Sequence, residues 1–308
     1  MQVKTLSTSR YNSTNVSASA VISGTQKAIF GYGESGGNVS MTNLVSNTGT
    51  VANDVTGVGT ARRLLAAAGY GTDKAIFGYG YTSANVSMTN LVSNTGVVAT
   101  DTTGVGTDRR VLSAARYGTD KAIFGYGYVA GPVSITNLVS NTGVVANDVT
   151  GVGTARYGLA AAGYGTDKAI FGYGYTTGNV SMTNLVSNTG TVATDTTGVG
   201  TARNSSAAAG YSSDKAIFGY GTNGGNLSIT NLVSNTGVVA TDTTGVGTAR
   251  FDLSAAGYGS DKAIFGYGYT SAAVSMTNLV SNTGVVATDT TGVGTARNAL
   301  AAAGYSST

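Results

Sequence analysis

The sequence of 308 residues contains no cysteine, no histidine, no tryptophan and a single proline. Without cysteine and histidine, the chain cannot use disulfide bonds, thiolate chemistry, histidine metal ligands or histidine acid–base catalysis. Charged residues are also scarce, at 10% of the chain, whereas hydrophobic residues make up 41%. This balance is too apolar for a disordered chain, and the polar surface must consist mainly of Ser, Thr, Asn and Gly. The composition therefore favours a stable, loop-rich β protein.

The first residues and the apolar runs of the chain carry no targeting signal. The opening stretch MQVKTLSTSRYNSTN lacks the apolar core of a signal peptide. No apolar run approaches the length of about 20 residues that a membrane-spanning helix needs. We therefore expect synthesis in the cytoplasm without a signal peptide, and no insertion into a membrane.

The formal net charge of +3 is spread along the chain and is not gathered in one segment. A lysine, an arginine and two aspartates recur in nearly every repeat described below, so the repeated framework is close to neutral. The sequence contains no basic stripe that could follow the phosphates of a nucleic acid. We therefore expect no nucleic-acid partner.

One stretch, DKAIFGYG from Asp73 to Gly80, returns along the whole chain. Its lysine recurs every 47 residues, at Lys27, Lys74, Lys121, Lys168, Lys215 and Lys262. Between these copies the words VSMTNLVSNTG, VVATDTTGVGTAR and LAAAGYG return with few changes. A period of this length with its own strand and turn signals is typical of a repeat architecture. The six units therefore predict one folded body.

Each unit contains four short segments with strand character, which in the second unit are 65–70, 74–79, 86–92 and 97–109. Alanine and glycine dominate the first segment, and the next two carry Ile, Phe, Val, Met and Leu. Turn signals such as Asn94-Thr95-Gly96 separate the segments. Four strands in one such period match one blade of a β-propeller.

We therefore predict an all-β fold, a six-bladed β-propeller of four-stranded antiparallel blades. The small-residue segment would be the innermost strand, because only small side chains fit where the blades converge. A linear β-solenoid with the same period is the alternative fold. Its exposed end faces would need polar caps, and the sequence shows none.

The two ends of the chain bear on how such a ring closes. The small-residue segment has seven copies where six are needed, because it occurs at both 16–22 and 299–305. We assign residues 16–308 to a single six-bladed propeller, and residues 1–15 to an N-terminal segment for attachment or closure. We expect the ring to close by pairing of the two ends. The sequence leaves open which end supplies the strand.

The order of the segments resembles the Kelch-type propeller family from about residue 10 to residue 305. A small-residue strand follows an arginine, and a second strand ends in Gly78-Tyr79-Gly80, where Kelch units carry a glycine pair. A last strand then leads to the next arginine. The Kelch tryptophan has no counterpart, and Val97 or Val98 lies nearest its place. The resemblance implies a propeller that binds partners through a face of loops.

The six units differ from one another mainly after Gly-Tyr-Gly and after the recurring arginine. In an antiparallel blade these two connections emerge on one face, and the nearly invariant Gly-Thr-Asp and Ser-Asn-Thr-Gly turns lie on the opposite face. Tyrosine and arginine, which supply much of the binding energy at interfaces, are frequent at the variable positions. The alternative is that these loops vary because nothing constrains them. The predicted ligand-binding residues are Glu34, Tyr81, Tyr128, Tyr175, Thr222 and Tyr269 after Gly-Tyr-Gly, and Arg63, Arg110, Tyr157, Asn204, Phe251 and Asn298 after the arginine.

The aspartate at Asp101 and the arginine at Arg109 recur in every unit. A part repeated in every blade is more typical of a brace than of a catalytic site, which needs one asymmetric constellation. We therefore expect the aspartate to cap a turn or to pair with a blade arginine. A ring of carboxylates that binds calcium is the less favoured alternative. We expect no metal and no cofactor.

Together these observations favour a non-enzymatic binding or structural module that recognises a protein or glycan partner. Near-identical tandem units rich in Ser, Thr, Asn and Gly are also typical of virion fibre and decoration proteins. We therefore expect the chain to assemble into a phage virion or an appendage. A purely structural scaffold is one alternative. A propeller hydrolase or lyase is another, and it would use Glu34 and Asp252, two acidic residues outside the repeat pattern.

Overall fold

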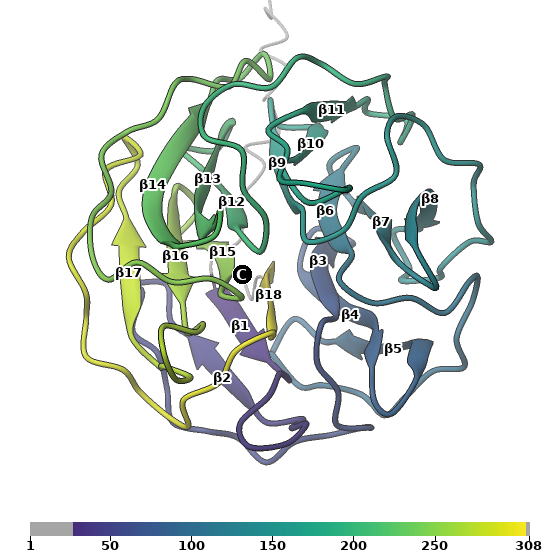
Figure 1. Ribbon diagram of the computed structural model, residues 1–308. Coiled ribbons are helices and arrows are strands. Elements are labelled where there is room, and N and C mark those ends of the chain that lie inside the picture. The colour runs from purple at the N-terminus through teal and green to yellow at the C-terminus, as the bar shows by residue number, and fades with distance from the viewer. Residues whose placement is uncertain (1–26, 306–308) are drawn as a thin grey trace, which may run out of the picture.

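The structure is a computed structural model that describes residues 27–305, and this part of the chain forms strands, turns and loops without a helix (Figure 1). The strands form six antiparallel sheets of three strands each. The predicted all-β fold of six repeated units is therefore confirmed. No helix long and apolar enough to cross a membrane occurs within residues 27–305.

Each sheet has an inner, a middle and an outer strand. The inner strands are β3 (Ala66–Tyr70), β6 (Ser113–Tyr117), β9 (Ala160–Tyr164), β12 (Ala207–Tyr211), β15 (Ser254–Tyr258) and β18 (Ala301–Tyr305). The middle strands are β1 (Lys27–Gly31), β4 (Lys74–Tyr81), β7 (Lys121–Tyr128), β10 (Lys168–Gly172), β13 (Lys215–Thr222) and β16 (Lys262–Gly266). The outer strands are β2 (Thr42–Val45), β5 (Asn85–Val92), β8 (Pro132–Val139), β11 (Thr183–Val186), β14 (Asn226–Val233) and β17 (Thr277–Val280).

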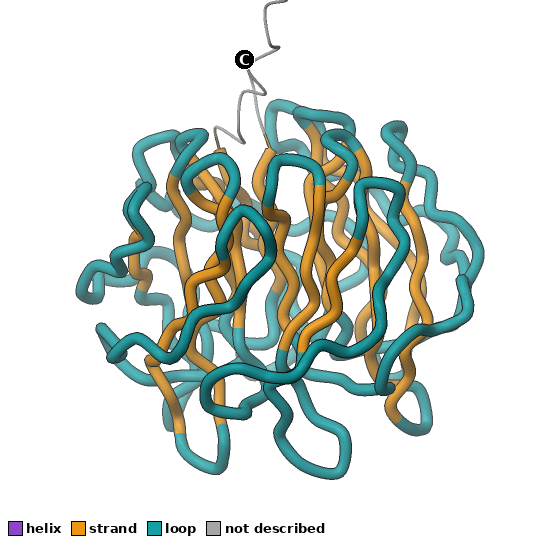
Figure 2. The backbone as a smooth tube through the Cα atoms, turned by 90° about the horizontal axis from the view of Figure 1, so that it is seen from above, coloured by secondary structure: helices purple, strands orange, loops and turns teal. Residues whose placement is uncertain are grey.

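The sheets, named I to VI in chain order, are β18-β1-β2, β3-β4-β5, β6-β7-β8, β9-β10-β11, β12-β13-β14 and β15-β16-β17. Figure 1 shows them around a common centre, with the inner strands nearest the middle. Neighbouring inner strands lie side by side in the cyclic order β18, β3, β6, β9, β12, β15 and back to β18. Figure 2 shows the strands running between two ends covered by loops.

These two ends are the variable face and the constant face. The variable face carries the loops after the middle strands, such as 82–84, and the connections after the recurring arginines. The constant face carries the turns after the inner strands, such as 71–73, and the turns after the outer strands, such as 93–96. An antiparallel strand order places these two pairs of connections at opposite ends of every sheet.

The prediction of four strands in each sheet is wrong, because the fourth segment does not form a continuous strand. In sheet II it makes only two isolated bridges, between Thr89 and Thr102 and between Val92 and Val98. Thr102 N donates to Thr89 O, and Ala99 N donates to Leu91 O, both at 2.8 Å. Between these two hydrogen bonds the fourth segment advances by three residues, from Ala99 to Thr102, whereas β5 advances by two, from Thr89 to Leu91. This extra residue interrupts the pairing.

The first sheet is assembled from both ends of the described chain. Strand β18 pairs antiparallel with β1, and Lys27 lies opposite Tyr305. The copy of the small-residue segment at 299–305 thus supplies the inner strand of sheet I, as one of the two expected closures requires. The other copy, at 16–22, and the segment 1–15 lie outside the described residues.

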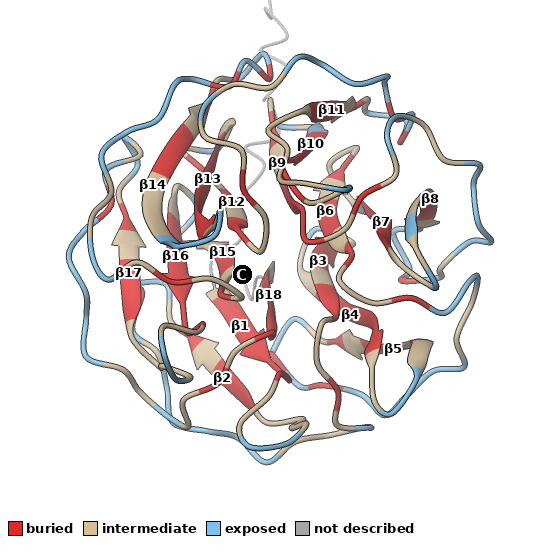
Figure 3. Cartoon of the chain, viewed as in Figure 1, coloured by how far each residue is buried: buried red, intermediate tan, exposed pale blue. Residues whose placement is uncertain are grey.

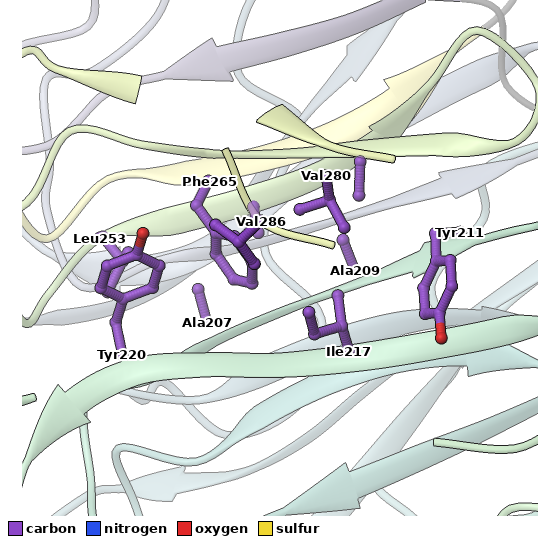
Figure 4. Packing of buried hydrophobic residues seen from close by; sticks show 11 residues of the cluster. Ala207, Ala209, Tyr211, Ile217, Tyr220, Leu253, Phe265, Val280 and Val286 are labelled. Carbon is purple, nitrogen blue, oxygen red and sulfur yellow. The ribbon is translucent and has the colours of Figure 1, made fainter. Parts of the chain in front are cut away.

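The hydrophobic core lies between neighbouring sheets. Figure 4 shows the cluster between sheets V and VI, in which Ile217 and Tyr220 of one sheet face Phe265 and Val280 of the other. Five further clusters of the same composition fill the other interfaces. Burying an aromatic or large aliphatic side chain stabilises the fold by about 1.5–3 kcal/mol. Figure 3 shows the buried strands inside and exposed residues concentrated in the outer loops.

The recurring Gly-Tyr-Gly places a tyrosine in each of these interfaces. Tyr79 has φ 63°, and the register of β4 and β5 shifts between Gly78 and Gly80. The bulge directs the fully buried Tyr79 ring onto Phe124 of the next sheet, with 5.1 Å between the ring centroids. Burial raises the pKa of Tyr79 to about 12. The expected packing of this tyrosine between units is confirmed.

Candidate functional site

The structure brings the twelve predicted ligand-binding residues together as six pairs on the variable face. In each pair the residue after the arginine forms an isolated antiparallel bridge with the residue after Gly-Tyr-Gly. In sheet II, Tyr81 N donates to Arg63 O at 2.8 Å, and Arg63 N donates to Tyr81 O at 3.1 Å. All twelve residues are partly exposed. The pairs are Glu34–Asn298, Arg63–Tyr81, Arg110–Tyr128, Tyr157–Tyr175, Asn204–Thr222 and Phe251–Tyr269.

Charged and aromatic side chains of three neighbouring pairs are in contact. Arg63 forms an ion pair with Glu34 of sheet I, with 2.6 Å between Nη1 and Oε1. The guanidinium of Arg110 lies between two tyrosines, 4.8 Å from the ring centroid of Tyr81 and 5.0 Å from that of Tyr128. Such cation–π contacts contribute about 0.5–1 kcal/mol each at exposed sites. They fix the arginine in a defined position on the surface.

The row of contacts continues through aromatic rings alone. Tyr128 packs edge-on against Tyr157, with 5.3 Å between the centroids, and Tyr157 lies 5.5 Å from Tyr175. The phenol of Tyr157 is partly desolvated, which raises its pKa, and the neighbouring phenols raise it further. The row therefore spans four sheets without interruption. We call these seven residues the arc: Glu34, Arg63, Tyr81, Arg110, Tyr128, Tyr157 and Tyr175.

The remaining pairs lie outside the arc. Phe251 packs on its bridge partner Tyr269, with 5.5 Å between the centroids. Asn204 Nδ2 donates a 2.6 Å hydrogen bond to Asn179 Oδ1. The variable face is therefore divided into a sector rich in tyrosine and arginine and a sector of mixed side chains.

Asparagines that directly follow the variable loops after the middle strands connect neighbouring sheets. Asn38 Nδ2 donates to Thr82 O at 3.0 Å, and Asn226 Nδ2 donates to Thr270 O at 3.1 Å. Each bond joins one sheet to the loop of the next, which keeps the variable face in a fixed shape. These asparagines were not among the residues predicted to have a function. Their recurrence at the same place in four units was the available signal.

A cyclic set of backbone hydrogen bonds surrounds the central axis at the variable face. It involves the residue two places after each recurring arginine, and each backbone N–H donates to the carbonyl of its counterpart in the preceding sheet at 2.7–3.1 Å. All of these residues have a left-handed backbone, with φ between 50° and 63°. They line a small funnel of about 70 Å³. The members of this mouth ring are Leu64, Val111, Gly158, Ser205, Asp252 and Ala299.

One member of the mouth ring carries a charge. Burial raises the pKa of the Asp252 carboxyl, although a hydrogen bond from Ser205 opposes this effect, and the negative charge of Glu34 raises it further. The charge of Glu34 therefore acts on Asp252 across sheets I and VI, and these are the two acids of the alternative enzyme hypothesis. Glu34 is engaged by Arg63, so the two carboxyls have different surroundings.

The recurring aspartate and arginine act as a brace, as expected. Arg62 is fully buried, donates from Nη2 to Asn90 Oδ1 at 2.7 Å, and lies 4.4 Å from the ring centroid of Tyr32 in the preceding sheet. Asp101 Oδ1 lies 3.8 Å from Arg62 Nη1, and Asp101 Oδ2 accepts a 2.6 Å hydrogen bond from Thr60 Oγ1. Burial alone would raise the pKa of Asp101, but hydrogen bonds from Thr60 and Asn90 and the charge of Arg62 lower it. These groups hold neighbouring sheets together.

Within residues 27–305 no three His, Cys, Asp or Glu side chains gather in a way that could hold a metal ion. In comparisons with known proteins, no family model and no curated protein matches the chain. The geometry of the variable face therefore carries the functional argument.

Proposed function

We propose that this chain is a six-bladed β-propeller that binds a partner through its variable face without catalysing a reaction. The cyclic order of the inner strands and the pairing of β18 with β1 support the propeller. The arc is the single observation that carries the binding function. It gathers partly exposed tyrosines and arginines from variable positions of the units into one row across four sheets.

The surroundings of the arc explain why binding is favoured over random variation of the loops. The backbone bridges and the asparagine contacts hold the arc residues in place before a partner arrives. A preorganised surface loses less conformational entropy on binding, so more of the contact energy appears as affinity. Tyrosines present both a flat apolar ring and a hydroxyl group, which suits a glycan or a protein surface.

We further propose that the chain is a component of a phage virion or an appendage, and that it belongs to a divergent branch of the Kelch-like propellers. The support is compositional and comes from near-identical units rich in Ser, Thr, Asn and Gly and from the order of segments around each arginine. In that setting the constant face is suited to attachment, since the Ser-Asn-Thr-Gly turn recurs there in all six units.

The test is a screen of glycans and of bacterial surfaces with the purified protein and two variants. In the first, Tyr81, Tyr128, Tyr175 and Tyr269 are replaced by Ala. In the matched control, four lysines of the constant face, Lys74, Lys121, Lys168 and Lys262, are replaced by Ala. We expect the tyrosine variant to lose binding and the lysine variant to retain it. Undiminished binding by the tyrosine variant would refute the assignment of the variable face.

A further inference from the structure

One inner strand breaks the pattern of the other five at a position near the constant face. The residue before the last tyrosine of the strand is Gly69, Gly163, Gly210, Gly257 or Gly304 in five sheets. In β6 of sheet III the same position holds Arg116. The change lies outside the variable loops, and it places a charge where the rest of the ring has only small residues.

The side chain of Arg116 extends from β6 across the neighbouring inner strand β3. A Cβ atom built on Gly69 would lie 4.0 Å from Arg116 Cδ, so the arginine covers this glycine. Alternate residues of β6, Ala115 and Tyr117, pack on the other side in the interface with sheet IV. Arg116 lies two residues beyond Ala114 along β6, toward the constant face, and Ala114 lines a central cavity of about 120 Å³.

The guanidinium of Arg116 lacks a compensating partner. Its Nη2 atom is buried, and among the described residues nothing accepts a hydrogen bond from it. The carboxylate of Asp120, whose charge acts on Arg116, forms an ion pair with Lys121 at 2.8 Å. Burial lowers the pKa of Arg116, and the charge of Asp120 opposes this only in part. Arg116 as a whole is partly exposed, but a buried guanidinium N–H group without an acceptor is costly, so this position favours an anion.

We propose that Arg116 binds a small oxyanion, a phosphate or carboxylate group, at the constant-face end of the central channel. The planar guanidinium offers paired N–H donors that match both groups. The site is separate from the variable face, and it does not depend on the function proposed there. One anion would bind per chain, because the other five sheets carry glycine at this position.

The experiment measures thermal unfolding as potassium phosphate is raised, with potassium chloride keeping the ionic strength constant. Phosphate stabilises many proteins without a site, so the informative quantity is the difference between wild type and R116G. R116G restores the residue that the other five sheets carry, and it is expected to fold. We expect the midpoint of the wild type to rise more steeply with phosphate than that of R116G. Potassium acetate in place of phosphate shows whether a carboxylate is also accepted.

A relocation variant makes the test independent of the local structure of sheet III. In R116G/G163R the cation moves to the equivalent position of the next sheet, and the extra phosphate dependence should return. Isothermal titration with phosphate should then give one site for the wild type and the relocation variant, and none for R116G. An equal phosphate response in the wild type and R116G, or no heat of binding to the wild type, would overturn the proposal.

Discussion

Arg297 donates a 2.6 Å hydrogen bond from Nη2 to Asn43 Oδ1, although 254 residues separate the two along the chain. In sheet II the same contact joins Arg62 and Asn90, which are only 28 residues apart. The same arginine–asparagine contact therefore occurs once between the two ends of the described chain and five times between residues close in sequence. Asn43 and Arg297 hold the two ends of the described chain together beside the pairing of β1 with β18.

This relationship predicts the cost of removing the asparagine. Asn43→Ala leaves a buried guanidinium without one of its acceptors, and a hydrogen bond to a charged group contributes about 1.5–3 kcal/mol. We expect the free energy of unfolding in guanidinium chloride to fall by that amount. Asn90→Ala is the matched control, and it should cost the same if the ring unfolds as one unit. A much smaller effect of Asn43→Ala than of Asn90→Ala would show that the ends separate before the rest.

A second prediction concerns the close approach of neighbouring sheets at the Gly-Tyr-Gly bulge. A Cβ atom at Gly172 would lie 2.7 Å from Phe218 Cζ, whereas one at Gly178 would meet nothing within 4 Å. Overpacking of this kind typically costs about 1–3 kcal/mol. We expect Gly172→Ala to lower the unfolding midpoint and Gly178→Ala, in a loop of the same unit, to leave it nearly unchanged. Chemical denaturation of the two variants side by side decides this, and equal midpoints would contradict the packing described.

The partly exposed carboxyl of Asp252 in the mouth ring predicts a pH-dependent gain in stability on its removal. Burial raises its pKa in the folded state, so the folded protein holds this proton more tightly than the unfolded chain does. The contribution of Asp252 to stability is therefore most favourable at low pH, and it is lost as pH rises through the folded-state pKa. We expect Asp252→Asn to be more stable than the wild type at pH 7.5, with the difference shrinking toward pH 3.5. Denaturation curves at both pH values measure it, and a variant that is less stable at pH 7.5 would contradict the prediction.

The arc predicts an uneven distribution of binding energy over the variable face. Tyr157 contacts two other arc tyrosines, whereas Phe251 packs on a single tyrosine outside the arc. Central aromatic residues of an interface typically cost about 2 kcal/mol or more when truncated, roughly a 30-fold loss of affinity. With a ligand from the screen in hand, we expect Tyr157→Ala to cause such a loss and Phe251→Ala to change affinity little. The reverse result would place recognition in the other sector.

Much of the fold follows from the repeat itself. The strand ranges around Lys74 and Val92 agree with β4 and β5 to within a few residues, because apolar periodicity and turn residues mark them. The prediction of a fourth strand was wrong because of a non-local contact. Asp101 leaves the ladder to accept hydrogen bonds from Thr60, and this use of its carboxylate depends on a residue 41 positions away.

Only part of the candidate site could be predicted from the sequence. Comparison of the units located the variable residues, but their pairing depends on bridges such as that of Arg63 with Tyr81, which follow from how two connections meet. The residues of the mouth ring were recognisable in the sequence only as variable positions, because members such as Leu64 and Gly158 share a backbone conformation and no side-chain chemistry. Arg116 was visible as a substitution, but its missing partner was not.

The mouth ring separates the shape of the opening from its chemistry. Its hydrogen bonds use backbone atoms alone, so a change from Leu64 to the aspartate type found at Asp252 leaves the same set of bonds in place. Each of the six positions can therefore carry a different residue while the ring of backbone hydrogen bonds stays the same. A single substitution in the mouth ring can therefore place a new charged or apolar side chain at the opening. The cost is limited to holding that residue in a left-handed conformation.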